Sequence, residues 1–300
     1  MRVPTVSVLF NLSRRGFVAL LLATLAACTT PVPPPSDSAQ GSSASAQDSA
    51  ATRVVALTSL TADLVATLAG DRLVGIPGSS LLRNDPRFAA ATVVSEGRVE
   101  PNLEKIIALE PDLVLGAKGF HDKVLARLEE LGVPVLTVEV ASWDALESVT
   151  QDLAERLGAD SSPLLARYQD CLAQAPAQAP TALVLVSRQP LLSPNRESWA
   201  GDFLTQFRFQ NLTADLQGDS SLGGYVTLSE EQVLAANPEL LLVVETEENL
   251  LEQLKQDAFW GQLAATKTEA VHTFDYFGLI NPGSLASIEA TCKRLARLGR

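Results

Sequence analysis

Hydrophobic and polar residues alternate along this chain with two different periods. Short aliphatic runs such as RVVALTS (53–59) and TALVLVS (181–187) end in serine, and each is followed by apolar residues at helical spacing. Such runs predict buried strands, and the stretches between them predict amphipathic helices. Strands that alternate with helices favour right-handed βαβ crossovers and parallel sheets. We therefore expect an α/β protein.

One supersecondary unit occurs twice. RVEPNLEKIIALEPDLVLG (98–116) and YVTLSEEQVLAANPELLLV (225–243) align without a gap, which places Pro111 opposite Pro238. Each stretch predicts a short amphipathic helix, a proline stop and an aliphatic strand. The serine-ended strands repeat at nearly the same spacing. Two such halves predict two Rossmann-like lobes with parallel-type sheets.

The segment between the repeats predicts the connection of the lobes. SWDALESVTQDLAERLG (142–158) and SSPLLARYQDCLAQA (161–175) carry apolar residues at helical spacing, and the second begins with Ser-Ser-Pro, a typical helix start. We interpret residues 142–179 as an inter-lobe helical segment with one long joining helix. The N-terminal lobe then covers 53–141 and the C-terminal lobe 180–300. A ligand cleft is expected between them, because ligands of open α/β sheets bind beyond the carboxyl ends of the strands.

The start of the chain predicts an export signal. Its apolar run, residues 17–27, has 11 residues, whereas a membrane-spanning helix needs about 20. Two arginines precede the run and small residues end it, which is typical of a secretory signal over 1–27. Residues 28–52 contain one branched aliphatic residue and no aromatic one, and we expect them to form a disordered tether.

Charge and composition exclude several classes of function. From Cys28 onward 20 basic residues stand against 35 acidic ones, a net charge of −15, which disfavours nucleic acid as a partner. His121 and His272 without a CxxC motif are too few soft ligands for a metal cage, so neither a metal site nor a cofactor is expected. GxSxG and HExxH motifs are absent, which disfavours an enzyme. Cys171 and Cys292 are either a disulfide or two buried thiols.

Five motifs follow one another over residues 53–298: RVVALTSLTADLVATLAGDRLVGIPG, PNLEKIIALEPDLVLGAKG, LGVPVLTVE, LSEEQVLAANPELLLV and NPGSLASIEA. Together they resemble the ferric-siderophore and vitamin B12 substrate-binding proteins of ABC importers. The resemblance implies two α/β lobes joined by one rigid helix, a monomer without enzymatic activity, and delivery of a small ligand to a membrane permease and its ATPase.

Two further resemblances concern the N-terminus. Residues 13–17, SRRGF, resemble a twin-arginine export signal, and residues 25–28, LAAC, resemble the lipobox of bacterial lipoproteins. The second implies lipidation of Cys28. The protein is then expected in the periplasm or on the outer face of the cytoplasmic membrane, held there by its lipid anchor.

The family resemblance also implies which side chains face the ligand. Arg98 lies where siderophore binders often have arginine, and its repeat partner Tyr225 matches an aromatic residue of the opposite lobe. A guanidinium suits an anionic chelate, and a tyrosine can stack on a ligand or donate a hydrogen bond to it. Further candidates lie in loops expected at strand ends, namely Ser59, Lys118, Phe120, Arg188, Trp199, Glu245, Tyr276 and Asn281. Trp199 has a core position as its alternative. The expected permease-docking residues are Glu96, Glu100 and Glu231.

The expected ligand is a ferric siderophore or a related iron(III) chelate. A corrinoid or haem bound by the same fold is the main alternative, and the lack of any methionine other than Met1 leaves Tyr225 and His272 as haem ligands. A non-transport surface module and an exported enzyme are less favoured.

Overall fold

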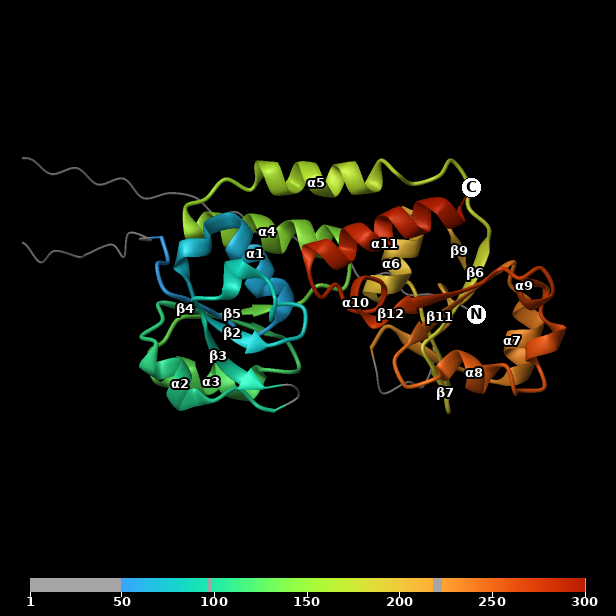
Figure 1. Ribbon diagram of the computed structural model, residues 1–300, viewed down its shortest axis with the longest axis horizontal. Coiled ribbons are helices and arrows are strands. Elements are labelled where there is room, and N and C mark those ends of the chain that lie inside the picture. The colour runs from blue at the N-terminus through green and yellow to red at the C-terminus, as the bar shows by residue number, and fades with distance from the viewer. Residues whose placement is uncertain (1–49, 97–98, 218–222, 300) are drawn as a thin grey trace, which may run out of the picture. The chain divides into compact units, whose positions relative to one another are not determined.

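The computed structural model describes residues 50–96, 99–217 and 223–299. Its first lobe contains a five-stranded parallel sheet with the strand order β3-β2-β1-β4-β5 (Figure 1). The strands are β1 (Val54–Ala56), β2 (Leu73–Gly78), β3 (Thr92–Glu96), β4 (Leu113–Ala117) and β5 (Val135–Val138). Its helices are α1 (Ser59–Ala69), η1 (Gly70–Arg72), η2 (Pro86–Phe88), α2 (Leu103–Ala108) and α3 (Asp122–Glu130).

The second lobe contains a four-stranded parallel sheet with the order β12-β11-β6-β9. The strands are β6 (Thr181–Leu185), β9 (Gln210–Asn211), β11 (Leu240–Glu245) and β12 (Val271–Asp275). Its helices are α6 (Trp199–Gln206), α7 (Glu230–Ala236), α8 (Leu250–Leu254), η3 (Trp260–Gln262), α9 (Ala264–Lys267), α10 (Tyr276–Leu279) and α11 (Leu285–Leu298). The predicted α/β fold with parallel sheets in two lobes is confirmed.

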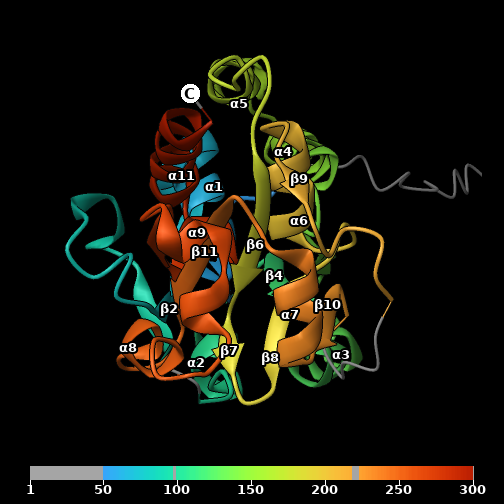
Figure 2. The ribbon, with the colours of Figure 1, turned by 90° about the vertical axis from the view of Figure 1, so that its right-hand side faces the viewer.

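A small antiparallel sheet extends the second lobe beyond the carboxyl end of β6 (Figure 2). It consists of β10, β8 and β7, in that order, and their bounds are Tyr225–Leu228, Leu191–Pro194 and Ser187–Arg188. The sequence did not predict this sheet, because strands of two to four residues are too short to show a hydrophobic period.

The pairing of the strands repeats between the lobes. In the first sheet Val54 of β1 lies opposite Leu113 of β4, and in the second Ala182 of β6 lies opposite Leu240 of β11. Leu113 and Leu240 are also partners in the ungapped alignment of the two sequence repeats. The duplication therefore extends to the register of the sheets.

Two helices, α4 (Trp143–Leu157) and α5 (Ser162–Leu172), lie between the sheets in the chain, and α5 covers most of the stretch 161–175 that was expected to form the joining helix. Gly158 ends α4 in the left-handed conformation, with φ at 56°, and a short turn leads into α5. Helix α5 packs against α11, and Cys171 of α5 forms a disulfide with Cys292 of α11 across a Cα–Cα distance of 5.7 Å.

Aromatic side chains fill the junction of α4, α5 and α6. The indole rings of Trp143 and Trp199 stack at a centroid distance of 5.6 Å, and Tyr168 meets Trp143 edge-on. Phe203 packs against both tryptophans. This cluster is continuous with the apolar residues between the sheets and the helices of both lobes, so one core spans them. In the described part of the chain no helix is both long and apolar enough to cross a membrane.

Candidate ligand-binding site

Several of the residues expected to face a ligand lie at the carboxyl edge of the second sheet or in the small sheet beyond it. Tyr225 begins β10, and Tyr276 follows β12 directly. Burial raises the pKa of Tyr225, and the nearby Tyr276 phenol raises it further. Tyr276 is 40% exposed, and its ring meets Phe277 edge-on at 5.3 Å. The Tyr225 phenol is therefore held neutral, which makes it a hydrogen-bond donor beside an aromatic wall.

Asn281 lies next to this wall in a tight turn. Its side-chain Oδ1 accepts a hydrogen bond from the Gly283 amide at 2.9 Å, and its carbonyl accepts one from Gly278 at 2.6 Å. Gly283 has a φ of 67°, and a Cβ atom there would lie 2.6 Å from Phe277 and 3.1 Å from Leu81. Only glycine fits this close approach, which brings a loop of the first lobe against the turn.

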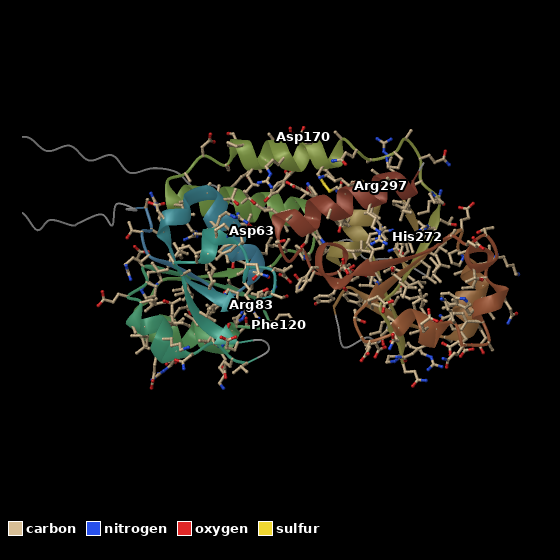
Figure 3. The ribbon with its side chains drawn as sticks, in the orientation of Figure 1. Asp63, Arg83, Phe120, Asp170, His272 and Arg297 are labelled. Carbon is tan, nitrogen blue, oxygen red and sulfur yellow. A yellow bond between two sulfur atoms is a disulfide. The ribbon has the colours of Figure 1, made fainter. Side chains whose placement is uncertain are left out.

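That loop, residues 79–91, follows β2 and lines a cavity of about 560 Å³ together with the ends of β2 and β3. Arg83 lies in the loop with an exposed side chain (Figure 3). Within the described ranges no carboxylate lies at ion-pair distance from Arg83, whose charge is therefore available to an anion. The sequence analysis missed Arg83, although the rule that loops after parallel strands hold ligands applies to it directly.

Two other cations expected at strand ends are paired. Lys118 Nζ lies 2.7 Å from Glu139 Oε2, and the hydrogen bond to Glu139 raises the pKa of Lys118. Arg188 Nη2 lies 2.6 Å from Oδ1 of Asp257, a mostly buried carboxylate. Each of these two cations therefore has a carboxylate partner within the protein, and their contact with a ligand stays a prediction.

Trp199 is not a ligand-facing residue in this structure. Its side chain is 3% exposed, its ring stacks on Trp143, and its Nε1 donates a hydrogen bond to the Gly278 carbonyl at 2.8 Å. Ser198 caps the start of α6 and turns the apolar face of the helix inward. The expectation of a ligand contact was therefore wrong, and the alternative core position is the one observed.

Phe120 has the most exposed of the large apolar side chains described, at 89%. It follows Gly119, which has a φ of 78°, and precedes His121, whose Nδ1 accepts a hydrogen bond from the Ala117 amide at 2.9 Å. Burial lowers the pKa of His121, so the imidazole stays neutral and keeps this acceptor. The His121 bond holds the loop that presents the Phe120 ring to solvent.

A family model described as periplasmic binding protein matches residues 54–276. The chain belongs to the periplasmic binding protein family. Among its relatives, the Fe(3+) dicitrate-binding periplasmic protein FecB of Escherichia coli (strain K12) is 28% identical over 59% of this chain and 60% of FecB, so the match spans less than two thirds of that protein. A vitamin B12-binding protein of Yersinia pestis (strain Pestoides F) is 24% identical over 83% of this chain and 88% of its own length.

Solved structures show the same fold at lower identity. The periplasmic haem-binding protein HutB of Vibrio cholerae superposes with a TM-score of 0.68 at 19% identity, over 82% of this chain and 98% of HutB. The relatives of this periplasmic binding protein are binding proteins rather than enzymes, in agreement with the prediction that the chain catalyses no reaction. Membership in this family supports an exported location.

The remaining candidate residues occupy varied positions in this periplasmic binding protein. Ser59 is the first residue of α1, and Glu245 is the last residue of β11, both half-buried. Arg98, the strongest candidate from the sequence, lies outside the described residues, as does Cys28. In the described ranges no group of three His, Cys, Asp or Glu side chains could hold a metal ion.

The three glutamates expected to dock on a permease differ in their surroundings. Glu96 ends β3 and lines the cavity that Arg83 also lines. Glu100 lies 3.8 Å from Lys123 Nζ. Glu231 is exposed in the first turn of α7, where hydrogen bonds from its own amide and from Ser229 lower its pKa. Their docking role stays a prediction.

Proposed function

We propose that the protein is the exported binding component of an ABC importer, which captures a ferric siderophore or a related iron(III) chelate and delivers it to a membrane permease with its ATPase. The observation that carries the proposal is the approach of two unlike walls. Leu81 of the loop 79–91 packs over Gly283 of the turn that holds Asn281. Leu81 stands two residues before Arg83, for which no carboxylate partner lies among the described residues, and Gly283 follows Tyr276 in the same segment, so the contact joins a cationic loop to an aromatic turn.

The chemistry of these walls suits an anionic chelate. A guanidinium offers a permanent charge and a fork of donors, which match the carboxylate, hydroxamate or catecholate groups around ferric iron. A neutral Tyr225 phenol adds a donor, and the Tyr276 ring adds an apolar surface. Iron is in this proposal the cargo, held by its own chelator.

A corrinoid or haem is the second candidate. The exposed ring of Phe120 and the edge-on pair Tyr276 and Phe277 would suit a flat macrocycle. The vitamin B12-binding and haem-binding relatives support this alternative.

Intrinsic tryptophan fluorescence of the chain from residue 29 tests the ligand class, with ferric citrate, ferric catecholate and ferric hydroxamate complexes, cobalamin and haem as probes. We expect saturable quenching by a ferric complex and at least about tenfold weaker binding in Arg83→Gln, since a hydrogen bond to a charged group contributes roughly 1.5–3 kcal/mol. The matched control is Arg127→Gln, which removes an exposed arginine of the same lobe that pairs with Glu130.

The outcomes separate the candidates. Quenching by cobalamin or haem alone would replace the iron chelate with the macrocycle. A lack of quenching by every probe would contradict the proposed function. Equal affinities for the Arg83 and Arg127 variants would leave Arg98 as the residue to test by Arg98→Ala.

A further inference from the structure

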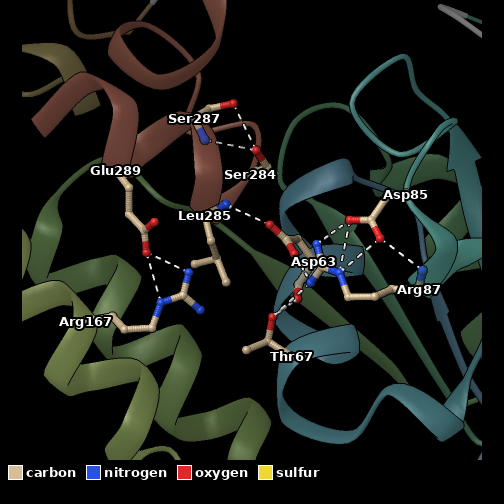
Figure 4. Close-up of polar contacts among 9 residues, drawn as sticks. All are labelled: Asp63, Thr67, Asp85, Arg87, Arg167, Ser284, Leu285, Ser287 and Glu289. Atoms are coloured by element: carbon tan, nitrogen blue, oxygen red, sulfur yellow. Dashed lines mark hydrogen bonds and ion pairs between the residues drawn. The ribbon is translucent and has the colours of Figure 1, made fainter. Parts of the chain in front are cut away.

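One buried carboxylate contacts both lobes. Asp63 lies on α1 and is 2% exposed, and its two oxygens accept hydrogen bonds from different lobes (Figure 4). Oδ1 accepts from Arg87 Nη1 at 2.8 Å, in the first lobe, and Oδ2 accepts from the Leu285 amide at 2.8 Å, in the second. A carboxylate buried this far needs such partners, because an unpaired buried charge is strongly destabilising.

The Arg87 side of this contact leads into the loop 79–91. Arg87 also binds Asp85 through Nε at 3.0 Å and through Nη2 at 2.6 Å, and the hydrogen bond to Asp85 raises the pKa of Arg87. Asp85 accepts the Arg87 amide as well, which caps η2. The Asp63–Arg87 bond therefore ties the far end of the cavity-lining loop to α1.

The Leu285 side leads into the turn at Asn281. Leu285 is the first residue of α11, and the preceding Ser284 caps the helix by accepting the Ser287 amide at 3.2 Å. Asp63 thus satisfies one of the free amides at the start of α11 and places a negative charge at the positive end of the helix dipole. Gly283, over which Leu81 packs, is two residues away.

A second carboxylate repeats this contact in the opposite direction. Asp202 of α6 accepts the amide of Trp143, the first residue of α4, at 2.7 Å. Helix α1 follows β1, and α6 is the first helix after β6, separated from it by the short strands β7 and β8. Helix α4 follows β5, and α11 comes after β12 and the short α10. The first helix of each lobe therefore caps a longer helix that comes after the last parallel strand of the other lobe. Of the two aspartates, Asp63 is the one hydrogen-bonded to a loop that lines the candidate site.

We propose that Asp63 is a positioning residue that couples the loop 79–91 to the segment 281–285, so that the two walls of the binding site keep one arrangement before a ligand arrives. The consequence for ligand binding rests on the proposed function, because preorganised walls lower the entropy that binding must overcome. The coupling between the lobes does not depend on the identity of the ligand.

Hydrogen exchange of the ligand-free protein tests the coupling in Arg87→Met. Arg87 is half exposed, so this variant should fold, but it removes the cation that compensates the buried Asp63 charge. We expect the amides of residues 285–287 to exchange about tenfold faster, although they lie in the other lobe and Arg87 makes no hydrogen bond to them. Asp63→Asn, which keeps one acceptor oxygen, should accelerate the same amides less than Asp63→Ala.

Arg167→Met is the matched control. Arg167 has nearly the same exposure as Arg87 and pairs with Glu289 of α11 at 2.6 Å, but among the described residues its hydrogen bonds are to Glu289 alone (Figure 4). This variant should leave the exchange of residues 79–91 unchanged. Unchanged exchange at 285–287 in Arg87→Met, or equal acceleration there in both variants, would overturn the coupling.

Ferric citrate is the probe for the effect of this coupling on ligand binding. We expect Arg87→Met to weaken its binding by about tenfold, mainly through faster dissociation, with wild-type affinity in Arg167→Met. Accelerated exchange in a protein that binds no ferric complex would support the coupling and contradict the proposed function. Normal ferric citrate binding in Arg87→Met would overturn the positioning role.

Discussion

At the scale of single residues, carboxylates hold the ends of elements. Asp112 accepts hydrogen bonds from the amide and hydroxyl of Thr52 at 2.7 Å each, just before β1, and Glu239 accepts the same pair of bonds from Thr181 at 2.9 Å. Asp112 and Glu239 are partners in the alignment of the two sequence repeats. We call each of these pairs of hydrogen bonds a clamp. The duplication therefore preserves a clamp at the start of each lobe as well as the apolar pattern.

The Asp112 clamp predicts a dependence of stability on pH. Burial opposes ionisation of Asp112, but the hydrogen bonds from Thr52 and Arg53 outweigh it and hold the pKa of Asp112 below its usual range. A lowered folded pKa gives stability that is complete above the unfolded value of about 3.9 and is lost as the pH falls through the folded pKa. We therefore expect Asp112→Asn to lower the urea midpoint at pH 7 and to differ less from wild type below about pH 4.

The control for this measurement is Glu104→Gln, an exposed change on α2. Its urea midpoint should follow the wild-type curve across the pH range. A constant difference between Asp112→Asn and wild type from pH 7 to pH 3 would show that the clamp does not depend on ionisation.

The core position of Trp199 predicts that its substitution lowers the stability of the protein without changing its affinity for a ligand. Its ring stacks in the core and its indole N–H donates to Gly278. We expect Trp199→Ala to lower the free energy of unfolding by roughly 3–5 kcal/mol, and Trp199→Phe to lower it less. Urea denaturation measures both, with the half-buried Trp260→Phe as control. Loss of ligand affinity in a stably folded Trp199→Phe would return this residue to the binding site.

At the scale of elements, helix α11 of the second lobe is held by contacts from several other parts of the chain. Asp63 and Ser284 cap its start, Arg167 of α5 binds Glu289 in its middle, and Cys292 is bonded to Cys171. These contacts lie along about two turns of the same helix. Because α11 contacts both α1 and α5, its position links the first lobe to the connecting segment.

The disulfide closes a span of 121 residues and predicts a large effect of removing it. We expect the double variant Cys171→Ala and Cys292→Ala to lower the free energy of unfolding by about 2–4 kcal/mol, chiefly because the unfolded chain gains freedom. Chemical denaturation of the chain from residue 29 measures this effect, and wild type under reducing conditions should match the variant. Two free thiols in the denatured, unreduced protein would contradict the bond.

At the scale of the whole molecule, each parallel sheet ends in a loop that meets the other lobe. The loop 79–91 of the first lobe touches the turn at Gly283 of the second, and one of the hydrophobic clusters runs through both lobes. For the proposed binding between these walls we expect little rearrangement, because the two walls already touch.

The proposed anchor predicts the location of the whole protein. Cys28→Ser in the full chain should shift the protein from the membrane pellet to the soluble fraction after expression in a bacterium that processes lipoproteins, because an acyl chain supplies the membrane affinity. A serine variant that still sediments with membranes would contradict lipidation at this position. Wild-type protein in the same preparation is the control.

Much of the fold could be predicted, because its signals are local. The period of apolar residues predicted the strands and helices, and the internal repeat predicted two lobes. The short antiparallel strands were not predicted from the sequence, since four residues such as 225–228 contain too few positions to show a period. The separation of α4 from α5 was predicted, because Ser-Ser-Pro at 161–163 is a typical helix start.

The candidate site was predicted less well. Position after a strand correctly placed Tyr276 and Asn281 at a common edge, but the same rule also selected Lys118 and Arg188, whose charges are paired. Their partners, Glu139 and Asp257, lie 21 and 69 residues away. A sequence pattern of short range contains no signal for such pairs.

The sequence by itself determined the α/β class, the duplication and the family, because these follow from periods and motifs that neighbouring residues carry. Only the tertiary structure decided that Lys118 and Arg188 are paired while Arg83 meets no carboxylate of the described residues, that Trp199 is buried and that Asp63 joins the lobes. Asp63 and Leu285 are 222 residues apart and meet because both sheets and α11 are folded around one core. Burial and pairing are properties of that arrangement, so they arise only when the whole chain has packed.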